Sequence, residues 1–246
     1  MVHYIATDDG AHHDDQANND KHAGTLGKRV DGSDVSSEAG AARWLTIHDD
    51  LLRGLAHAFS NRVATVVAIA AHLDPSRAPD ERLLHGLRSD VDRLEELLKC
   101  LRQLPRRGEG DPEPMLPLDG VTGALALFAH HPAYGSMRCT VGSAEGVPPV
   151  RADPLALQHA LCVALVSACR AGGDVAGVAV ALSTDGEVVR IAVSAEGGHG
   201  EGEAAALAQD VRAVDWLLAG SHGRGSAASL GCTLELPTLQ ASRRRP

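Results

Sequence analysis

The chain has 246 residues, enough for one or two compact domains with tails, and a formal net charge of −9 at pH 7. This charge disfavours nucleic acid and anionic membrane as the main partners. No uninterrupted apolar run reaches the ~18–20 residues of a membrane span, and the first residues do not form a signal peptide. We therefore expect a cytoplasmic protein without a membrane segment.

Residues 1–40 are rich in Asp, Asn, Gly and Ser and poor in large apolar side chains, which predicts a disordered N-terminal tail. The histidines of this tail could bind metal adventitiously, but their pattern does not support a dedicated metal site. The five cysteines are scattered without paired spacing, so we expect neither a disulfide framework nor a zinc site.

Residues 52–73 have the pattern of an amphipathic helix, because apolar side chains recur in steps of three and four. His57 falls on the solvated face, and Asn61 and Arg53 lie four residues to either side of it. An imidazole flanked by an amide and a guanidinium suits chemistry on an anionic group such as phosphate. An inert surface histidine is the alternative. The apolar positions are Leu52, Leu55, Phe59, Val63, Val66, Ala70 and Leu73.

A second helix is predicted over residues 81–104, where leucine or valine alternates in steps of three and four from Leu84 to Leu101. Helix breakers in residues 74–80 separate it from the first helix, so we expect a helical hairpin over residues 41–106. Two antiparallel helices cannot bury both apolar stripes alone. A second copy would complete a dimeric four-helix bundle, whereas packing on the chain's own C-terminal domain is the alternative.

Residues 107–118 are rich in Pro, Gly and Glu and predict a linker between domains. Residues 119–238 then alternate helix and strand patterns, which predicts an α+β sandwich with helices on one face of a mixed sheet. Within it, Asp153 should cap an apolar helix, and Asp185-Gly186 is a strong hairpin signal. We expect flexible connections at the glycine-rich loops, residues 197–202 and 220–226, and a tail at residues 239–246.

The run GLAHAFSNRVATVV, residues 54–67, resembles the dimerisation and phosphoacceptor helix of bacterial sensor histidine kinases. His57 falls on the phosphorylated histidine of that family and Asn61 on its polar residue four positions later, while Ala58 replaces the family's acidic residue. The runs ADPLALQHALCVALVSACRAG, VVRIAVSAEGGHG and GCTLELP resemble, in order, segments of the family's ATP-binding domain. The resemblance covers roughly residues 45–237 and implies the same two-domain fold.

The nucleotide site of that family is altered here. Val163 and Ser167 stand at its asparagine positions, and Ala195 stands where an aspartate bonds adenine, with Gly197 following in the same motif. The second glycine box has no counterpart, and the lid is shortened to residues around 198–203. Hydrogen bonds to charged partners contribute about 1.5–3 kcal/mol each, so their loss predicts no useful ATP binding and no resident cofactor.

Loss of the nucleotide site and of the acidic neighbour together predict no autokinase activity, because a carboxylate would fix the tautomer of the histidine. The resemblance then implies a histidine phosphotransferase of a phosphorelay. His57 would accept phosphoryl from the aspartate of a response-regulator receiver domain, with Arg53 or Arg62 neutralising the oxygens and magnesium supplied by the receiver. An upstream histidine kinase would be a further partner.

Three other functions stay open at this point. Asn61 could position a water against the receiver's acyl phosphate, which would make the protein a response-regulator phosphatase. A non-enzymatic dimeric scaffold that never carries phosphate is the second, and an active histidine kinase is the third.

Overall fold

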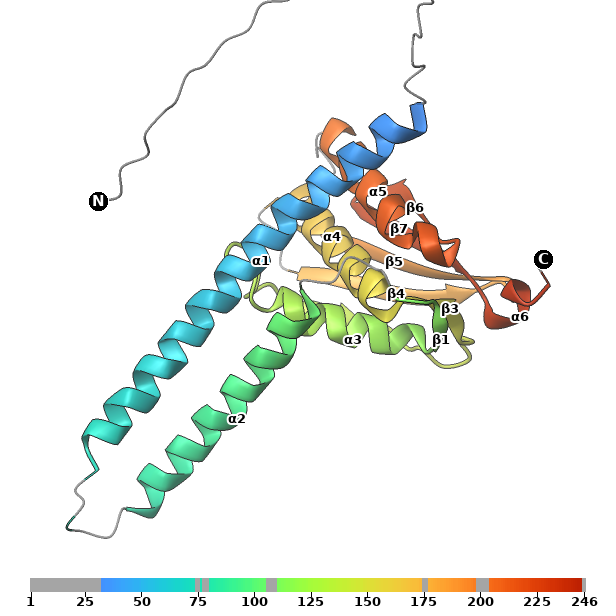
Figure 1. Ribbon diagram of the computed structural model, residues 1–246. Helices are drawn as coiled ribbons and strands as arrows, with labels where there is room; N and C mark the ends of the chain where they lie inside the picture. The colour runs from blue at the N-terminus through green and yellow to red at the C-terminus, as the bar shows by residue number, and fades with distance from the viewer. Residues whose placement is uncertain are drawn as a thin grey trace, which may run out of the picture. The chain divides into compact units, whose positions relative to one another are not determined.

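The computed structural model describes residues 32–73, 76, 80–104, 110–173, 177–197 and 204–244. Two long helices, α1 (Gly32–Ala71) and α2 (Glu81–Gln103), come first, and an α+β domain follows (Figure 1). This order confirms the predicted helical hairpin and sandwich. The four-helix bundle of two copies stays a prediction.

Helix α1 begins earlier than we expected. Residues 32–40, which the composition placed in a disordered tail, are helical. The reason is a long-range contact with α5 (Ala204–Leu218): a Cβ added at Gly40 would lie 2.6 Å from the carbonyl oxygen of Arg212. The C-terminal domain thus provides a surface for this part of the helix. Residues 1–31, including the histidines of the tail, lie outside the described residues.

A mixed five-stranded sheet forms the body of the α+β domain, in the order β2-β4-β5-β7-β6. β2 runs parallel to β4, and the other neighbours are antiparallel. β4 and β5 meet at the predicted Asp185-Gly186 turn, where Gly186 has a φ of 94°. The strands are β2 (Cys139–Val141), β4 (Gly177–Thr184), β5 (Val188–Glu196), β6 (Arg224–Ala228) and β7 (Gly231–Pro237).

Three segments that we expected to be irregular are ordered. β1 (Glu113–Met115) lies in the predicted linker and pairs with β3 (Val150–Ala152), and β6 lies partly in a predicted flexible loop and pairs with β7. The short α6 (Leu239–Ser242) lies in the predicted tail, where the Leu239 N–H donates to the Pro149 carbonyl at 2.8 Å. The partners of β1 and α6 are distant in sequence, so the local composition gave no signal for them, whereas β6 pairs with β7, the next strand along the chain.

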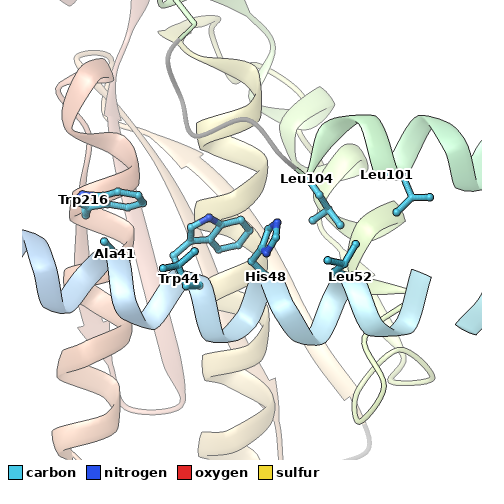
Figure 2. A pocket seen from close by; sticks show the side chains of 8 residues that line it. Ala41, Trp44, His48, Leu52, Leu101, Leu104 and Trp216 are labelled. Carbon is cyan, nitrogen blue, oxygen red and sulfur yellow. The ribbon is translucent and has the colours of Figure 1, made fainter. Parts of the chain in front are cut away.

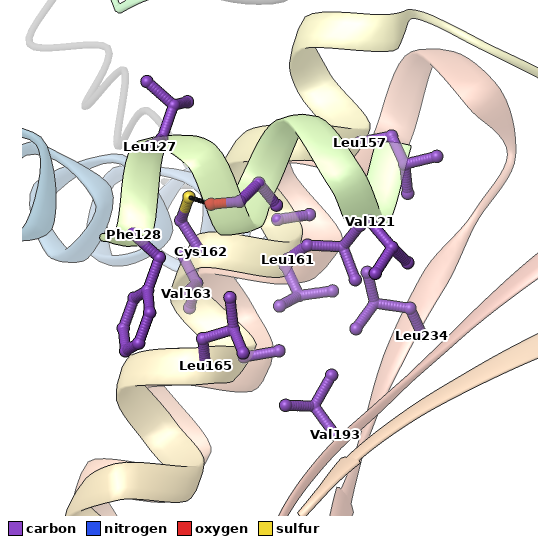
Figure 3. Packing of buried hydrophobic residues seen from close by; sticks show 14 of the residues in the cluster. Val121, Leu127, Phe128, Leu157, Leu161, Cys162, Val163, Leu165, Val193 and Leu234 are labelled. Atoms are coloured by element: carbon purple, nitrogen blue, oxygen red, sulfur yellow. Dashed lines mark hydrogen bonds between the residues drawn. The ribbon is translucent and has the colours of Figure 1, made fainter. Parts of the chain in front are cut away.

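The helices form a layer on one face of the sheet, as predicted. α4 (Pro154–Gly172) and α5 lie over the strands, α3 (Pro117–Phe128) packs beside α4, and the N-terminal half of α1 packs on α5 (Figure 1). Alternate residues of β5 face this layer and are buried. Figure 3 shows Leu161 and Leu165 of α4 in one apolar cluster with Val193 and Leu234 of the sheet.

Helix α4 is capped by Asp153, as predicted, because its carboxylate accepts hydrogen bonds from the Leu155 and Ala156 N–H groups at 2.9 and 3.4 Å. Among the described residues it is the one helix long and apolar enough to cross a membrane, which our search for uninterrupted apolar runs missed. However, 72% of its most apolar stretch is buried inside the protein. Its composition is that of a core helix.

Candidate functional site

His57 lies on an exposed face of α1, as its spacing predicted. Asn61, one turn later, is also exposed, and its Nδ2 lies 3.1 Å from Nε2 of His57. When the amide nitrogen donates, Nε2 is the unprotonated nitrogen of a neutral ring and the proton sits on Nδ1. The structure therefore brings these two predicted residues together, with the nucleophilic lone pair of the imidazole directed at the amide.

The two predicted arginines lie on different sides of α1. Arg53 is exposed and donates to Oδ1 of Asp50 at 3.1 Å. Arg62 is turned towards α2, where it donates to Oδ1 of Asp90 at 3.0 Å. Because Arg53 lies one turn before His57, it is the arginine that shares the face of the histidine. Arg62 is engaged in joining the two helices.

Ala58, next to the histidine, is partly buried against the apolar core. An alanine side chain offers no acceptor for the Nδ1 proton of His57. The hydrogen bond that holds the ring is therefore the one from Asn61 to the other nitrogen.

A segment that our sequence reasoning missed lies beside this face. The connection between α3 and β2, residues 129–138, approaches α1 at Gly54, where an added Cβ would lie 1.6 Å from the carbonyl oxygen of His130. Only a residue without a side chain allows this approach. Glycine inside a helix costs about 1 kcal/mol relative to alanine, so Gly54 was the available signal that another backbone packs there.

His131 fixes the conformation of this connection. It is buried, its Nδ1 accepts hydrogen bonds from the N–H groups of Ala133 and Tyr134 at 3.2 and 3.3 Å, and its ring stacks on Tyr134 with the centroids 4.9 Å apart. Burial lowers the pKa of His131, and the charge of Asp50 opposes that shift. Since Asp50 lies on α1 one heptad before His57, the connection lies beside the same face of the helix.

The positions of α4 and β5 that the sequence resemblance assigned to a nucleotide site are buried. Val163 and Ser167 on α4 are 0% and 2% exposed, and Ala195 on β5 is 6% exposed. Gly197 follows β5 with a φ of 86°, and the expected lid, residues 198–203, lies outside the described residues. A magnesium ligand must be polar and reachable, and a partner for adenine must carry an acceptor. Buried valine, serine and alanine do not fit ATP with magnesium.

Among the residues that the structure describes, no group of three or more His, Cys, Asp or Glu could hold a metal ion. Burial raises the pKa of the Cys162, Cys169 and Cys232 thiols to about 12, which keeps them protonated and unreactive at neutral pH.

An apolar groove of about 600 Å³ lies where the N-terminal half of α1 meets helix α5 and the C-terminal end of α2 (Figure 2). Trp44 and His48 stand at its centre, in edge-to-face contact with their ring centroids 5.8 Å apart. His48 therefore packs near Trp44. The other lining residues are Ala41, Leu45, Leu52, Leu101, Leu104 and Trp216.

No family model matches the chain, and no curated protein matches it. Among solved structures, the Acinetobacter baumannii histidine kinase AdeS is 16% identical, over 76% of this chain and 97% of that one, with a TM-score of 0.41. The histidine kinase ThkA, solved in complex with the response regulator TrrA, is 13% identical over 86% of this chain and 67% of that one, with a TM-score of 0.39. A bacterial phosphotransferase is 14% identical over 78% and 95%, with a TM-score of 0.36.

Proposed function

We propose that the protein is a histidine phosphotransferase of two-component signalling, which passes phosphoryl groups between response-regulator aspartates through His57. The observation that supports this best is the exposed imidazole whose Nε2 is held by Asn61 at 3.1 Å. A histidine displayed in this way can react with a group brought by another protein. The ring needs no nucleotide from its own chain.

The proposed step is an in-line attack of Nε2 on the phosphorus of an aspartyl phosphate. The N–P bond forms, the P–O bond to the acyl oxygen breaks, and the carboxylate of the receiver leaves with the electron pair. The Nδ1 proton of the resulting phosphoimidazolium is released to water, because Ala58 offers no acceptor for it. Asn61 must release Nε2 first, after which its amide can donate to a phosphoryl oxygen. Arg53 would supply positive charge on the same face, because its exposed ion pair with Asp50 contributes little and can open. Magnesium would belong to the receiver domain.

We also propose that ATP is not a substrate, since the buried Val163, Ser167 and Ala195 do not fit it. Titration calorimetry with a non-hydrolysable ATP analogue and magnesium should show no binding in the micromolar range. Micromolar binding would favour the active kinase instead.

A homodimer is the assembly that we propose. Leu84, Val91 and Leu98 recur every seven residues on α2 and are 37%, 43% and 40% exposed in the single chain. Leu45 and Leu52 of α1 have the same spacing and are also exposed, and Leu52 is one of the predicted apolar positions. A heptad stripe of this kind is buried by a second helix pair. The groove of Figure 2 continues this stripe towards the α+β domain. There α1 packs on α5, which is the contact with the chain's own C-terminal domain that we gave as the alternative to a dimer.

Incubation with a phosphorylated receiver domain separates transfer from its alternatives. We expect acid-labile phosphate on the wild type, none on His57→Gln, and normal labelling of His85→Gln, an exposed histidine of α2 that serves as control. Loss of receiver phosphate without label, dependent on Asn61, would indicate a phosphatase. Receiver phosphate unchanged by the wild type would indicate a scaffold.

A further inference from the structure

A small polar pocket lies where β3 and the short α6 meet the turn Ala219–Ser221, which follows α5 (Figure 1). We infer that this pocket binds inorganic phosphate in its hydrogen phosphate form. The inference does not depend on the proposed transfer at His57, because none of the described residues that line the pocket belongs to α1 or α2. The lining residues are Pro112, Arg151, Gly220, Ser221, His222 and Ser242.

The size of the pocket fits a small anion. Its volume is about 180 Å³, which is below the roughly 300–1,000 Å³ of pockets that hold drug-sized ligands. The same volume corresponds to about six water molecules in the liquid, at about 30 Å³ each. A tetrahedral oxyanion can be accommodated in this space, whereas a nucleotide cannot.

The charge around the pocket is positive. Arg151 presents guanidinium N–H groups, and it has no ion-pair partner in the part of the chain that the structure describes. His222 adds an imidazole N–H, and residues 243–244, both exposed arginines, directly follow α6. Asp111 and Glu113, on either side of the lining proline, do not themselves line the pocket. An anion therefore meets donors from β3 and from the turn, and no lining carboxylate repels it.

The two hydroxyl groups of the pocket have different free capacities. Ser221 is 3% exposed, and its Oγ accepts a hydrogen bond from the Asp153 N–H at 3.2 Å. Its own hydrogen has no acceptor among the described residues, although buried polar groups are normally paired. Ser242 donates its hydrogen to the Thr238 carbonyl at 3.0 Å, so its oxygen can only accept. Hydrogen phosphate satisfies both, because it has bare oxygens for Ser221 and a P–O–H group for Ser242.

His222 is held at the pocket in an unfavourable backbone conformation. Its φ of 53° makes it the one described non-glycine residue in the left-handed region. The N–H groups of His222 and Gly223 donate to the carbonyls of Ala219 and Leu218 at 3.3 and 3.2 Å, an ending of α5 that favours glycine at this position. These bonds also occupy the two carbonyls, so they do not face the anion as free acceptors. The strain indicates a role for the imidazole itself.

Calorimetric titration of the full chain with inorganic phosphate, at constant ionic strength, tests the inference. We expect saturable binding of a single phosphate by the wild type and an about tenfold higher Kd for Arg151→Gln, which loses a charged donor. His222→Gly should also raise the Kd about tenfold. Without phosphate this variant should unfold at a higher urea concentration than the wild type, because glycine relieves the strain. Arg88→Gln, at an exposed position of α2, is the matched control and should bind like the wild type.

Sulfate tests the assignment of the hydroxyl groups. It has the shape of phosphate but no hydrogen for Ser242 at neutral pH, so its Kd should be about tenfold higher than that of phosphate. No saturable phosphate binding by the wild type would overturn the inference, as would equal Kd values for sulfate and phosphate. A Kd that is unchanged in Arg151→Gln, or raised equally in Arg88→Gln, would show that phosphate does not bind in this pocket.

Discussion

His159 shows how strongly burial in this protein changes the pKa of a single side chain. It is fully buried on α4, its Nε2 donates to the Gln103 carbonyl at 3.0 Å, and its ring stacks on Trp44 with the centroids 4.3 Å apart. Burial lowers its pKa to about 4, which outweighs the opposite effect of the hydrogen bond to Gln103. The neutral ring thus joins the core helix of the α+β domain to the end of α2 and to α1.

We expect the free energy of unfolding to fall as the pH drops from about 6.5 to about 4. In that range the unfolded chain protonates His159 and the folded chain does not, so protons favour unfolding. The difference in pKa corresponds to about 3 kcal/mol, lost progressively across the range. Urea unfolding at several pH values measures it. His159→Phe, which retains an aromatic ring at that position, should flatten the profile, and the same profile in the variant would contradict the explanation.

At the same scale, helix geometry was enough to predict that Asn61 meets His57 and that both are exposed. The pairing of Arg62 with Asp90 could not be predicted in this way, because the partner lies on another helix. The contact of Gly54 with His130 could not be predicted either, because His130 lies on another segment of the chain. Periodicity shows which residues share a face of one element, but it does not show what packs against that face.

Among the elements, α1, α4 and α5 are joined by one buried carboxylate. Asp210 of α5 is 0% exposed, accepts from Nε of Arg43 on α1 at 2.6 Å, and also bonds Arg170 of α4. Two arginines compensate the charge that burial would otherwise make unfavourable. Together with the close approach at Gly40, this cluster attaches the N-terminal half of α1 to the α+β domain.

Replacing Asp210 by alanine should destabilise the fold by about 3–5 kcal/mol, because two arginines lose their buried partner. Asp92→Asn, at an exposed position of α2, removes the same charge and should change stability by less than about 0.5 kcal/mol. Chemical denaturation of both variants gives the comparison. A loss of less than about 1 kcal/mol in the free energy of unfolding of Asp210→Ala would show that this cluster does not attach α1 to the α+β domain.

For the whole molecule, the helical region followed by an α+β region, the mixed sheet and the helical layer could be predicted from the sequence, because long periodic segments and the Asp153 and Asp185-Gly186 signals are local. The start of α1 and the short β1 could not, since each is ordered by a distant partner. Strand β6 pairs with the adjacent β7, but its glycine-rich sequence indicated a loop. The apolar stripe of α2 was predicted from the sequence, and its residues Leu84, Val91 and Leu98 are exposed in the single chain.

The proposed dimer can be tested on that stripe. Val91→Glu combined with Leu98→Glu places two charges where a second copy would bury valine and leucine. Light scattering should give the mass of two chains for the wild type and of one chain for this variant. Arg82→Glu, an exposed charge change on another side of α2, should remain a dimer. A wild-type protein that is a monomer at all concentrations would contradict the assembly.

We propose that His57 receives its phosphoryl group from an aspartyl phosphate and not from ATP. The most direct test incubates the protein with radiolabelled ATP and magnesium in one reaction and with a radiolabelled receiver domain in another, followed by peptide mapping. We predict alkali-stable, acid-labile label on the peptide that contains His57, and only in the reaction with the receiver. Label on His57 from ATP alone, or none from the receiver, would contradict it.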